Sequence, residues 1–248
     1  MTTQTYTEQY DYIYDLLVDK ELDEELLDFL YHVPNHEDQM VMIKHPHFSF
    51  TIILQHDGEM GIEYQINRIN KSFFRKMEIV EKCKVKGDWS SYFILWVEKP
   101  FRFSEFLKYK NKLTDEEYWE ILGDVFISTE IQTDRMDEWI EVFNSQRPNR
   151  EYLMTDDEDL DFFNQLPDQV EIWRGVRDKD WIEGLSWTTD KEQGEWFVKS
   201  RGFSVDEHIL CNGWIEKDKI LMSSQHENLI VCNPKDITDL KTEKVKEV

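Results

Sequence analysis

The sequence is poor in small and structure-breaking residues: its 248 positions include no alanine, 9 glycines, 6 prolines and 3 cysteines. Alanine, glycine and proline have GC-rich codons, so their scarcity indicates an AT-rich genome. The odd, widely spaced cysteines predict neither a disulfide framework nor a Cys-x-x-Cys metal site. No apolar run reaches the roughly 18 residues that a membrane span needs. No basic residue precedes the first apolar stretch, so we expect no signal peptide and a cytoplasmic protein.

Positive charge is also scarce, because 29 Lys and Arg stand against 52 Asp and Glu, for a net charge of −23. The net charge is −12 over residues 1–65, +7 over 66–112, −15 over 113–172 and −3 over 173–248. A total charge of this size argues against a protein whose whole surface binds nucleic acid or anionic lipid. Aromatic residues make up 14% of the chain, including nine Trp, which excludes a disordered chain.

The first part of the chain, residues 1–112, has the pattern of a small α+β module. Apolar residues at helical spacing predict a helix within 6–31. Residues 47–66 are typical of two strands joined by a turn at Asp57-Gly58. A run of apolar residues predicts a further strand at 91–98. We expect this module to recognise a target.

From Thr114 onward the sequence predicts a second domain, 113–248. Thr114 with Glu117 three residues later matches a capping box at the start of a helix. Apolar stripes continue the helical pattern to residue 143, and an acidic helix is predicted at 156–166. Strands are predicted at 170–176, 184–189, 208–215, 219–224 and 228–233, with one helix at 190–200. We expect the last eight residues to be frayed.

Three histidines, His45, His47 and His56, lie close together in the sequence. Histidines on neighbouring strands can bind a metal, but no cysteine or regularly spaced carboxylate accompanies them. We therefore favour surface or paired histidines over a metal site.

The basic stretch 66–112 contains several aromatic residues. A positive face with interleaved rings can bind nucleic acid. Because the next segment, 113–172, carries a net charge of −15, we favour pairing of the two segments within one molecule. The aromatic residues are Phe73, Phe74, Trp89, Tyr92 and Phe93.

Four short motifs follow one another in the last third of the chain. They are Arg174-Gly175, Ser186-Trp187-Thr188-Thr189, Trp196-Phe197 and Gln225-His226-Glu227. In the sequence they read EIWRG, LSWTTD, GEWFV and QHENLIVCNP. Each motif by itself is more typical of an ordinary strand or a packed core than of a functional site. The functional interpretation therefore depends on the order in which the four motifs occur.

This order resembles the Arg–Ser–Glu class of the ADP-ribosyltransferase family, and in particular its phage and bacterial members. The resemblance covers residues 114–236. It implies an α+β domain with a split β-sandwich and a helical lead-in. It also implies that the domain cleaves NAD as a substrate, without a metal, and transfers ADP-ribose to a macromolecule.

Elementary chemistry explains why such residues should meet. Cleavage of the bond between nicotinamide and ribose passes through an oxocarbenium-like state, as in glycoside hydrolysis. A fixed carboxylate stabilises that charge, and Glu227 is the candidate. The resemblance implies that Glu227 also bonds the ribose 2′-hydroxyl. Arg174 offers a forked cation for the pyrophosphate. Gly175 lets the backbone approach a ligand without a Cβ clash, and the resemblance implies that this ligand group is the nicotinamide amide. Ser186 is expected to hold Glu227 in position.

Three further residues complete the predicted NAD site: Trp187, Thr188 and Phe197. The rings of Trp187 and Phe197, with that of Trp196, are candidates to pack on the nicotinamide.

Gln225 stands where many members of the family have a first glutamate. The family's glutamate accompanies arginine acceptors, because a carboxylate can deprotonate a guanidinium and an amide cannot. Arginine modification is therefore disfavoured here. If Gln225 and Glu227 share one face of a strand, His226 points to the other face and is not catalytic.

The sequence therefore predicts a mono-ADP-ribosyltransferase that uses NAD and acts on a host macromolecule, a protein rather than RNA or DNA. The expected setting is a phage effector or a bacterial toxin. Two alternatives stay open. A non-catalytic acidic inhibitor could mimic nucleic acid, and an NAD glycohydrolase would use water as the acceptor.

Overall fold

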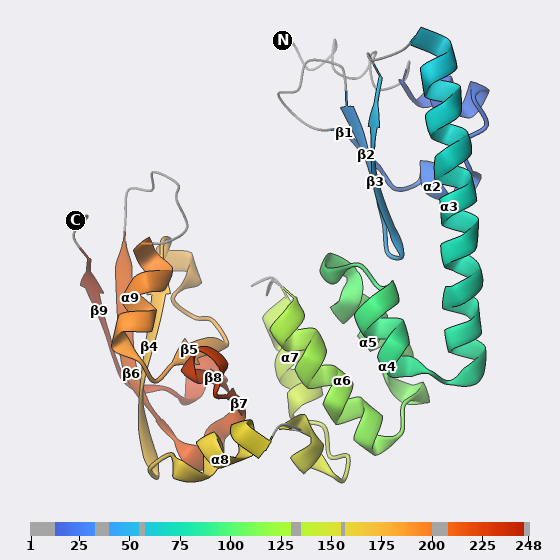
Figure 1. The fold of residues 1–248 in the computed structure, drawn as a ribbon. Coiled ribbons are helices and arrows are strands. Elements are labelled where there is room, and N and C mark those ends of the chain that lie inside the picture. Colours follow the sequence, from blue (N-terminus) through green and yellow to red (C-terminus); the bar gives the residue numbers. More distant parts are fainter. Residues whose placement is uncertain are drawn as a thin grey trace. The chain divides into compact units, whose positions relative to one another are not determined.

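The computed structural model describes residues 13–32, 40–54, 58–129, 135–154, 157–199 and 208–245. The chain divides into two compact units, Met1–Leu113 and Thr114–Val248 (Figure 1). The sequence analysis drew this boundary one residue earlier. Each unit combines helices with one antiparallel sheet, so the class is mixed α+β.

The first unit contains a three-stranded antiparallel sheet and one long helix. The sheet has the order β1 (Leu30–His32), β2 (Met40–His45), β3 (Phe48–Ile53). Residues 13–19 are helical and precede the short α2 (Glu24–Leu27). The long helix α3 (Gly58–Lys86) follows the sheet. The unit ends in short helices: α4 (Trp89–Ser91), a π-helical turn (Tyr92–Trp96), a 3-10 turn (Lys99–Phe101), α5 (Arg102–Tyr109) and a second 3-10 turn (Lys110–Lys112).

Two predictions for this unit are wrong. The hairpin turns between His45 and Phe48 instead of at Asp57-Gly58. Gly58 opens α3, and Asp57 lies outside the described residues. The run 91–98 forms helical turns, since an unbroken apolar run does not distinguish a strand from a buried helix. The helical prediction for 6–31 is confirmed at 13–19 and 24–27, except that β1 begins at Leu30; residues 6–12 lie outside the described residues.

His45 and His47 are buried at the end of the β2–β3 hairpin. The His47 backbone N–H donates to His45 Nδ1 at 3.1 Å, so the proton of that ring lies on Nε2, 3.2 Å from Glu25 Oε1. His47 Nδ1 donates to the Trp96 carbonyl at 3.1 Å. Burial lowers the pKa of both rings, which favours paired, neutral histidines. His56 lies outside the described residues.

The second unit begins with helices around an aromatic core. α6 (Asp115–Ser128) starts at the predicted capping box, in which the Thr114 and Glu117 side chains each accept from the other's backbone N–H. α7 (Met136–Phe143) packs on it through ring contacts, with Phe126 5.1 Å from Trp139 between centroids. Further along the chain lie a 3-10 turn (Arg150–Leu153) and the acidic helix α8 (Asp157–Gln165).

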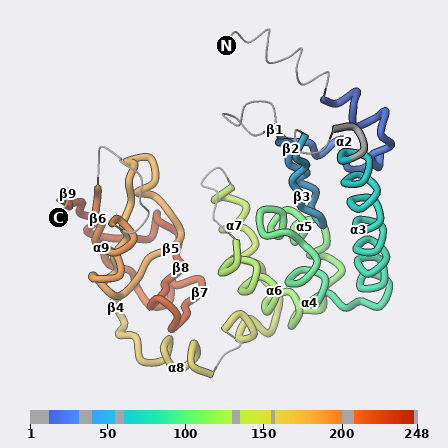
Figure 2. The backbone as a smooth tube through the Cα atoms, turned by 45° about the horizontal axis from the view of Figure 1, so that its top comes forward, coloured from blue at the N-terminus to red at the C-terminus, as the bar shows by residue number. Residues whose placement is uncertain are grey.

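Six antiparallel strands form the sheet of this unit, in the order β7-β8-β5-β4-β6-β9. All five strands predicted between 170 and 233 are present, and α9 packs on β4 (Figures 1 and 2). Phe162, Phe163 and Leu166 pack against the buried core of the sheet. The elements are β4 (Gln169–Val176), β5 (Ser186–Thr188), α9 (Lys191–Lys199), β6 (Ile209–Glu216), β7 (Ile220–Ser224), β8 (Leu229–Cys232) and β9 (Thr238–Lys244).

β9 corrects the expectation of a frayed tail for residues 241–244, whereas residues 246–248 lie outside the described residues. Residues 238–244 pair with β6, from Trp214↔Thr238 to Ile209↔Lys244. Every residue of this edge strand is exposed. Because the strand is held by backbone pairing and polar side-chain contacts (Thr238 with the Trp214 carbonyl, Glu243 with Lys191), no apolar alternation signals it in the sequence.

Candidate functional site

The strands that carry the predicted motifs are neighbours in the second sheet. β4, which contains Arg174, pairs with β5 through Trp173↔Thr188. β5 pairs in turn with β8, with Ser186 opposite Val231. The Gln225-His226-Glu227 motif lies in the turn that joins β7 to β8. Three motifs that are distant in the sequence therefore meet on adjacent strands.

Arg174 is held by backbone carbonyls on the loop before β5. Its Nε donates to the Trp181 carbonyl at 3.2 Å and its Nη1 to the Ser186 carbonyl at 2.5 Å. A Cβ on Gly184 would lie 2.2 Å from Arg174 Nη2. Glycine at position 184 therefore makes room for the guanidinium, a role that the sequence analysis missed.

Gly175 faces α9 instead of an open ligand site. A Cβ at this position would lie 2.2 Å from the Gly194 carbonyl oxygen and 2.6 Å from Val198 Cγ2. The helix therefore fills the space where a side chain at position 175 would stand, and the expected contact of the Gly175 backbone with nicotinamide stays a prediction. The small residues of GEWFV have the same cause, because a Cβ on Gly194 would lie 3.1 Å from Trp173 Cβ.

The turn between β7 and β8 has an unusual backbone. Glu227 and Asn228 both have positive φ, 60° and 49°. Left-handed conformation costs a non-glycine residue about 1 kcal/mol or more. The exposed Glu227 thus lies in a turn, so the condition under which His226 would point away, that Gln225 and Glu227 share a strand face, does not hold.

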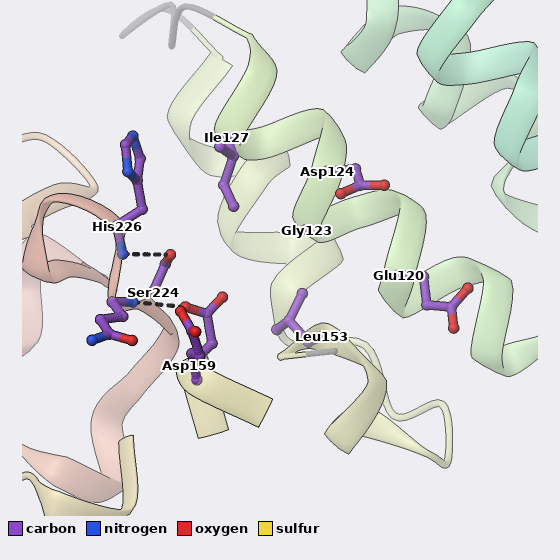
Figure 3. A pocket seen from close by; sticks show the side chains of 10 residues that line it. Glu120, Gly123, Asp124, Ile127, Leu153, Asp159, Ser224 and His226 are labelled. Atoms are coloured by element: carbon purple, nitrogen blue, oxygen red, sulfur yellow. Dashed lines mark hydrogen bonds between the residues drawn. The ribbon is translucent and has the colours of Figure 1, made fainter. Parts of the chain in front are cut away.

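The Asn228 N–H closes this turn by donating to the Gln225 carbonyl at 3.1 Å, and further hydrogen bonds hold it in place. Thr188 Oγ1 donates to the Glu227 carbonyl at 2.8 Å, and the Thr189 N–H donates to the Asn228 carbonyl at 3.0 Å. On the other side, Asp159 Oδ1 of α8 accepts the Gln225 N–H at 2.7 Å. The His226 N–H donates to Ser224 Oγ at 3.2 Å; Figure 3 draws the last two bonds. The turn is therefore fixed to β5 and to α8.

Ser186 was predicted to hold Glu227, but in the motif on β5 it is Thr188 whose side chain contacts the Glu227 residue. The buried Thr188 side chain contacts the Glu227 backbone, whereas Ser186 contributes its carbonyl to Arg174. Trp187 is only 2% exposed and its indole N–H donates to the Gly184 carbonyl at 2.7 Å. The expectation that its ring packs on nicotinamide is corrected, because it belongs to the core.

The aromatic pair on α9 remains near the surface. Trp196 is 53% exposed, and its ring lies 5.4 Å from that of Phe197 in an edge-to-face contact. A planar ligand can therefore reach Trp196.

A pocket of about 460 Å³ lies beside the turn (Figure 3). It was not predicted, since its walls come from α6, α8 and the turn. Burial, with the charges of Asp124, Glu116 and Glu117, raises the pKa of Glu120. This lining disfavours the phosphates of a dinucleotide. The lining residues are Glu120, Gly123, Asp124, Ile127, Leu153, Glu158, Asp159, Ser224, Gln225 and His226.

Two buried cysteines lie on strands of the second sheet, near the residues of the candidate site. Cys211 pairs with Arg174 across β4 and β6, and Cys232 is on β8. Both are buried, and burial raises their pKa values to about 11 and about 12. They are therefore core thiols at neutral pH and not nucleophiles.

Within the described ranges, no group of three His, Cys, Asp or Glu side chains could hold a metal ion. Among the helices that the structure describes, none is both long and apolar enough to cross a membrane. No family model, curated protein or solved structure matches the chain.

Proposed function

We propose that residues 114–248 form a mono-ADP-ribosyltransferase that cleaves NAD and passes ADP-ribose to a macromolecular acceptor. One observation carries the proposal: the Arg174 strand, the Ser186 strand and the turn with Glu227 are adjacent, with Ser186 and Thr188 contacting the other two motifs. With this function we also propose the fold of a split β-sandwich for the domain. The six-stranded sheet would belong to that sandwich.

The proposed chemistry uses the carboxylate of Glu227 as a fixed negative charge. It stabilises positive charge on the ribose as the bond to nicotinamide breaks and the bonding electrons leave with nicotinamide. Arg174 binds the pyrophosphate, with its guanidinium aimed by the carbonyls of Trp181 and Ser186. Trp196 offers the exposed ring for the ligand.

The acceptor then attacks the ribose and loses its proton. Gln225 precedes the catalytic position, and its amide cannot take a proton from a guanidinium. We therefore propose a protein acceptor group other than arginine. With water as the acceptor the same site would be an NAD glycohydrolase.

The test compares Glu227→Gln with Glu216→Gln, a matched change at another exposed glutamate. Removing one electrostatic stabiliser typically lowers kcat by 10²–10³-fold. We expect a loss of about that size in nicotinamide release for Glu227→Gln and wild-type release for Glu216→Gln. Equal release by both variants would contradict the proposal.

The alternatives give different results in the same assay. Nicotinamide release without transfer of label to protein or nucleic acid identifies a glycohydrolase. An acidic inhibitor releases no nicotinamide, and its target binding survives both Glu227→Gln and Arg174→Gln but weakens steeply with salt.

A further inference from the structure

The long helix α3 has two opposite faces. One face is buried against β3, the Tyr92–Trp96 turn and α4, and its side chains repeat at three- and four-residue intervals. The other face is solvent-exposed along the described side chains from Glu63 to Lys86. The buried residues are Ile62, Ile66, Ile69, Phe73, Val80 and Cys83.

The exposed face carries a line of positive charge. Its members are 3, 4, 7 and 4 residues apart, so they fall on one side of the helix. From first to last they span about 27 Å at 1.5 Å per residue. The line consists of Arg68, Lys71, Arg75, Lys82 and Lys86.

Few carboxylates lie close enough to this line of cations to neutralise its charge. Glu78 lies within it, and Glu81 at its side is bound by Lys84 at 2.8 Å. Lys76, on the flank of the helix, pairs with Glu98. Lys71, Arg75, Lys82 and Lys86 form no ion pair with any residue that the structure describes. The line is therefore a local concentration of cations in an acidic chain.

Two aromatic rings accompany the charges. Tyr64, four residues before Arg68, is 67% exposed, and Phe74, three residues after Lys71, is 57% exposed. Large rings on a basic helix are suited to stack on bases while the cations contact phosphates.

We propose that this face of α3, defined by the five cations with Tyr64 and Phe74, binds single-stranded nucleic acid. Stacking requires unpaired bases, which favours a single strand over a duplex. A lipid surface fits less well, because the apolar side of the helix is already buried in the core. Because the net charge of −23 repels a polyanion from the chain as a whole, binding requires a local concentration of cations such as this face. The proposal does not depend on the NAD chemistry of the second unit.

The first experiment measures binding of fluorescein-labelled oligothymidylate and oligouridylate, about 20 nucleotides long, by fluorescence anisotropy at several salt concentrations. With five cations engaged, log K should fall against log salt with a slope of about −3.5. The triple variant Lys71→Gln, Arg75→Gln, Lys82→Gln should reduce the slope to about −1.4. The charge-matched control Lys219→Gln, Lys235→Gln, Lys241→Gln should leave it unchanged; both are checked for folding by circular dichroism.

A second experiment separates nucleic acid from an acidic protein partner. Tyr64→Ala with Phe74→Ala should weaken oligonucleotide binding roughly tenfold, while leaving the salt slope unchanged. Polyglutamate of equal charge should compete poorly. The proposal is overturned by absence of binding at low salt, by equal slopes for the two triple variants, or by equal binding of polyglutamate.

Discussion

The contact between Asp159 and the Gln225 N–H offers a test of how the turn is held. Asp159→Ala removes the only α8 side-chain acceptor that the structure describes for this amide, at 2.7 Å. Asp159→Asn keeps an oxygen at the same place but removes the charge. If α8 positions the turn through this hydrogen bond, the asparagine variant should restore most of what the alanine variant loses.

The size of the effect follows from two opposing contributions. Hydrogen bonds to charged groups contribute about 1.5–3 kcal/mol, and solvent exposure reduces this one to about 1 kcal/mol. The positive φ values of Glu227 and Asn228 cost together about 2 kcal/mol. Losing the bond with Asp159 should therefore raise the population of other turn conformations about fivefold.

The assay has two readouts. Hydrogen exchange followed by mass spectrometry on peptides covering 222–229 should show faster exchange in Asp159→Ala and near wild-type exchange in Asp159→Asn. Nicotinamide release should fall up to about fivefold in the alanine variant alone. Unchanged exchange in Asp159→Ala would refute the positioning role, whereas changed exchange without any wild-type NAD cleavage would refute only the proposed chemistry.

Three further outcomes are expected. Gly175→Ala should destabilise the protein by about 1–3 kcal/mol, because its Cβ would meet a backbone carbonyl of α9 at 2.2 Å; an unchanged thermal midpoint would contradict this. Gly184→Ala should displace Arg174 and raise the KM for NAD more than it lowers kcat, and a wild-type KM would contradict the assignment. Burial lowers the pKa of His45 and His47, so the unfolded chain takes up protons first as the pH falls below 6.5. The urea midpoint should therefore drop between pH 7.5 and 5.5, and a constant midpoint would contradict the burial of neutral rings.

The second unit was more predictable from sequence than the first. Its strands are short and bounded by polar or glycine-containing turns, and its first helix begins at a capping box, Thr114 to Glu117. In the first unit the signals were ambiguous. Gly58 resembles a turn residue but opens a helix, and the apolar run 91–98 suits a strand or a buried helix equally.

In the candidate site, too, the sequence predicted the arrangement of strands better than the positions of single side chains. The order of motifs predicted that Arg174, Ser186 and Glu227 come together, and they do lie on or beside adjacent strands. The sequence could not show which face each side chain takes, so Trp187 was expected at a ligand but lies in the core. Contacts between distant elements, such as Asp159 with the turn, leave no local pattern at all.

The central claim is transfer of ADP-ribose, and mass spectrometry tests it most directly. Purified protein and NAD are incubated with a bacterial lysate, and proteins and nucleic acids are searched for added ADP-ribose, with Glu227→Gln as the control. We expect ADP-ribose on defined residues of protein acceptors, not on arginine, and none with the variant. No ADP-ribose on any macromolecule, or equal modification by the variant, would contradict it.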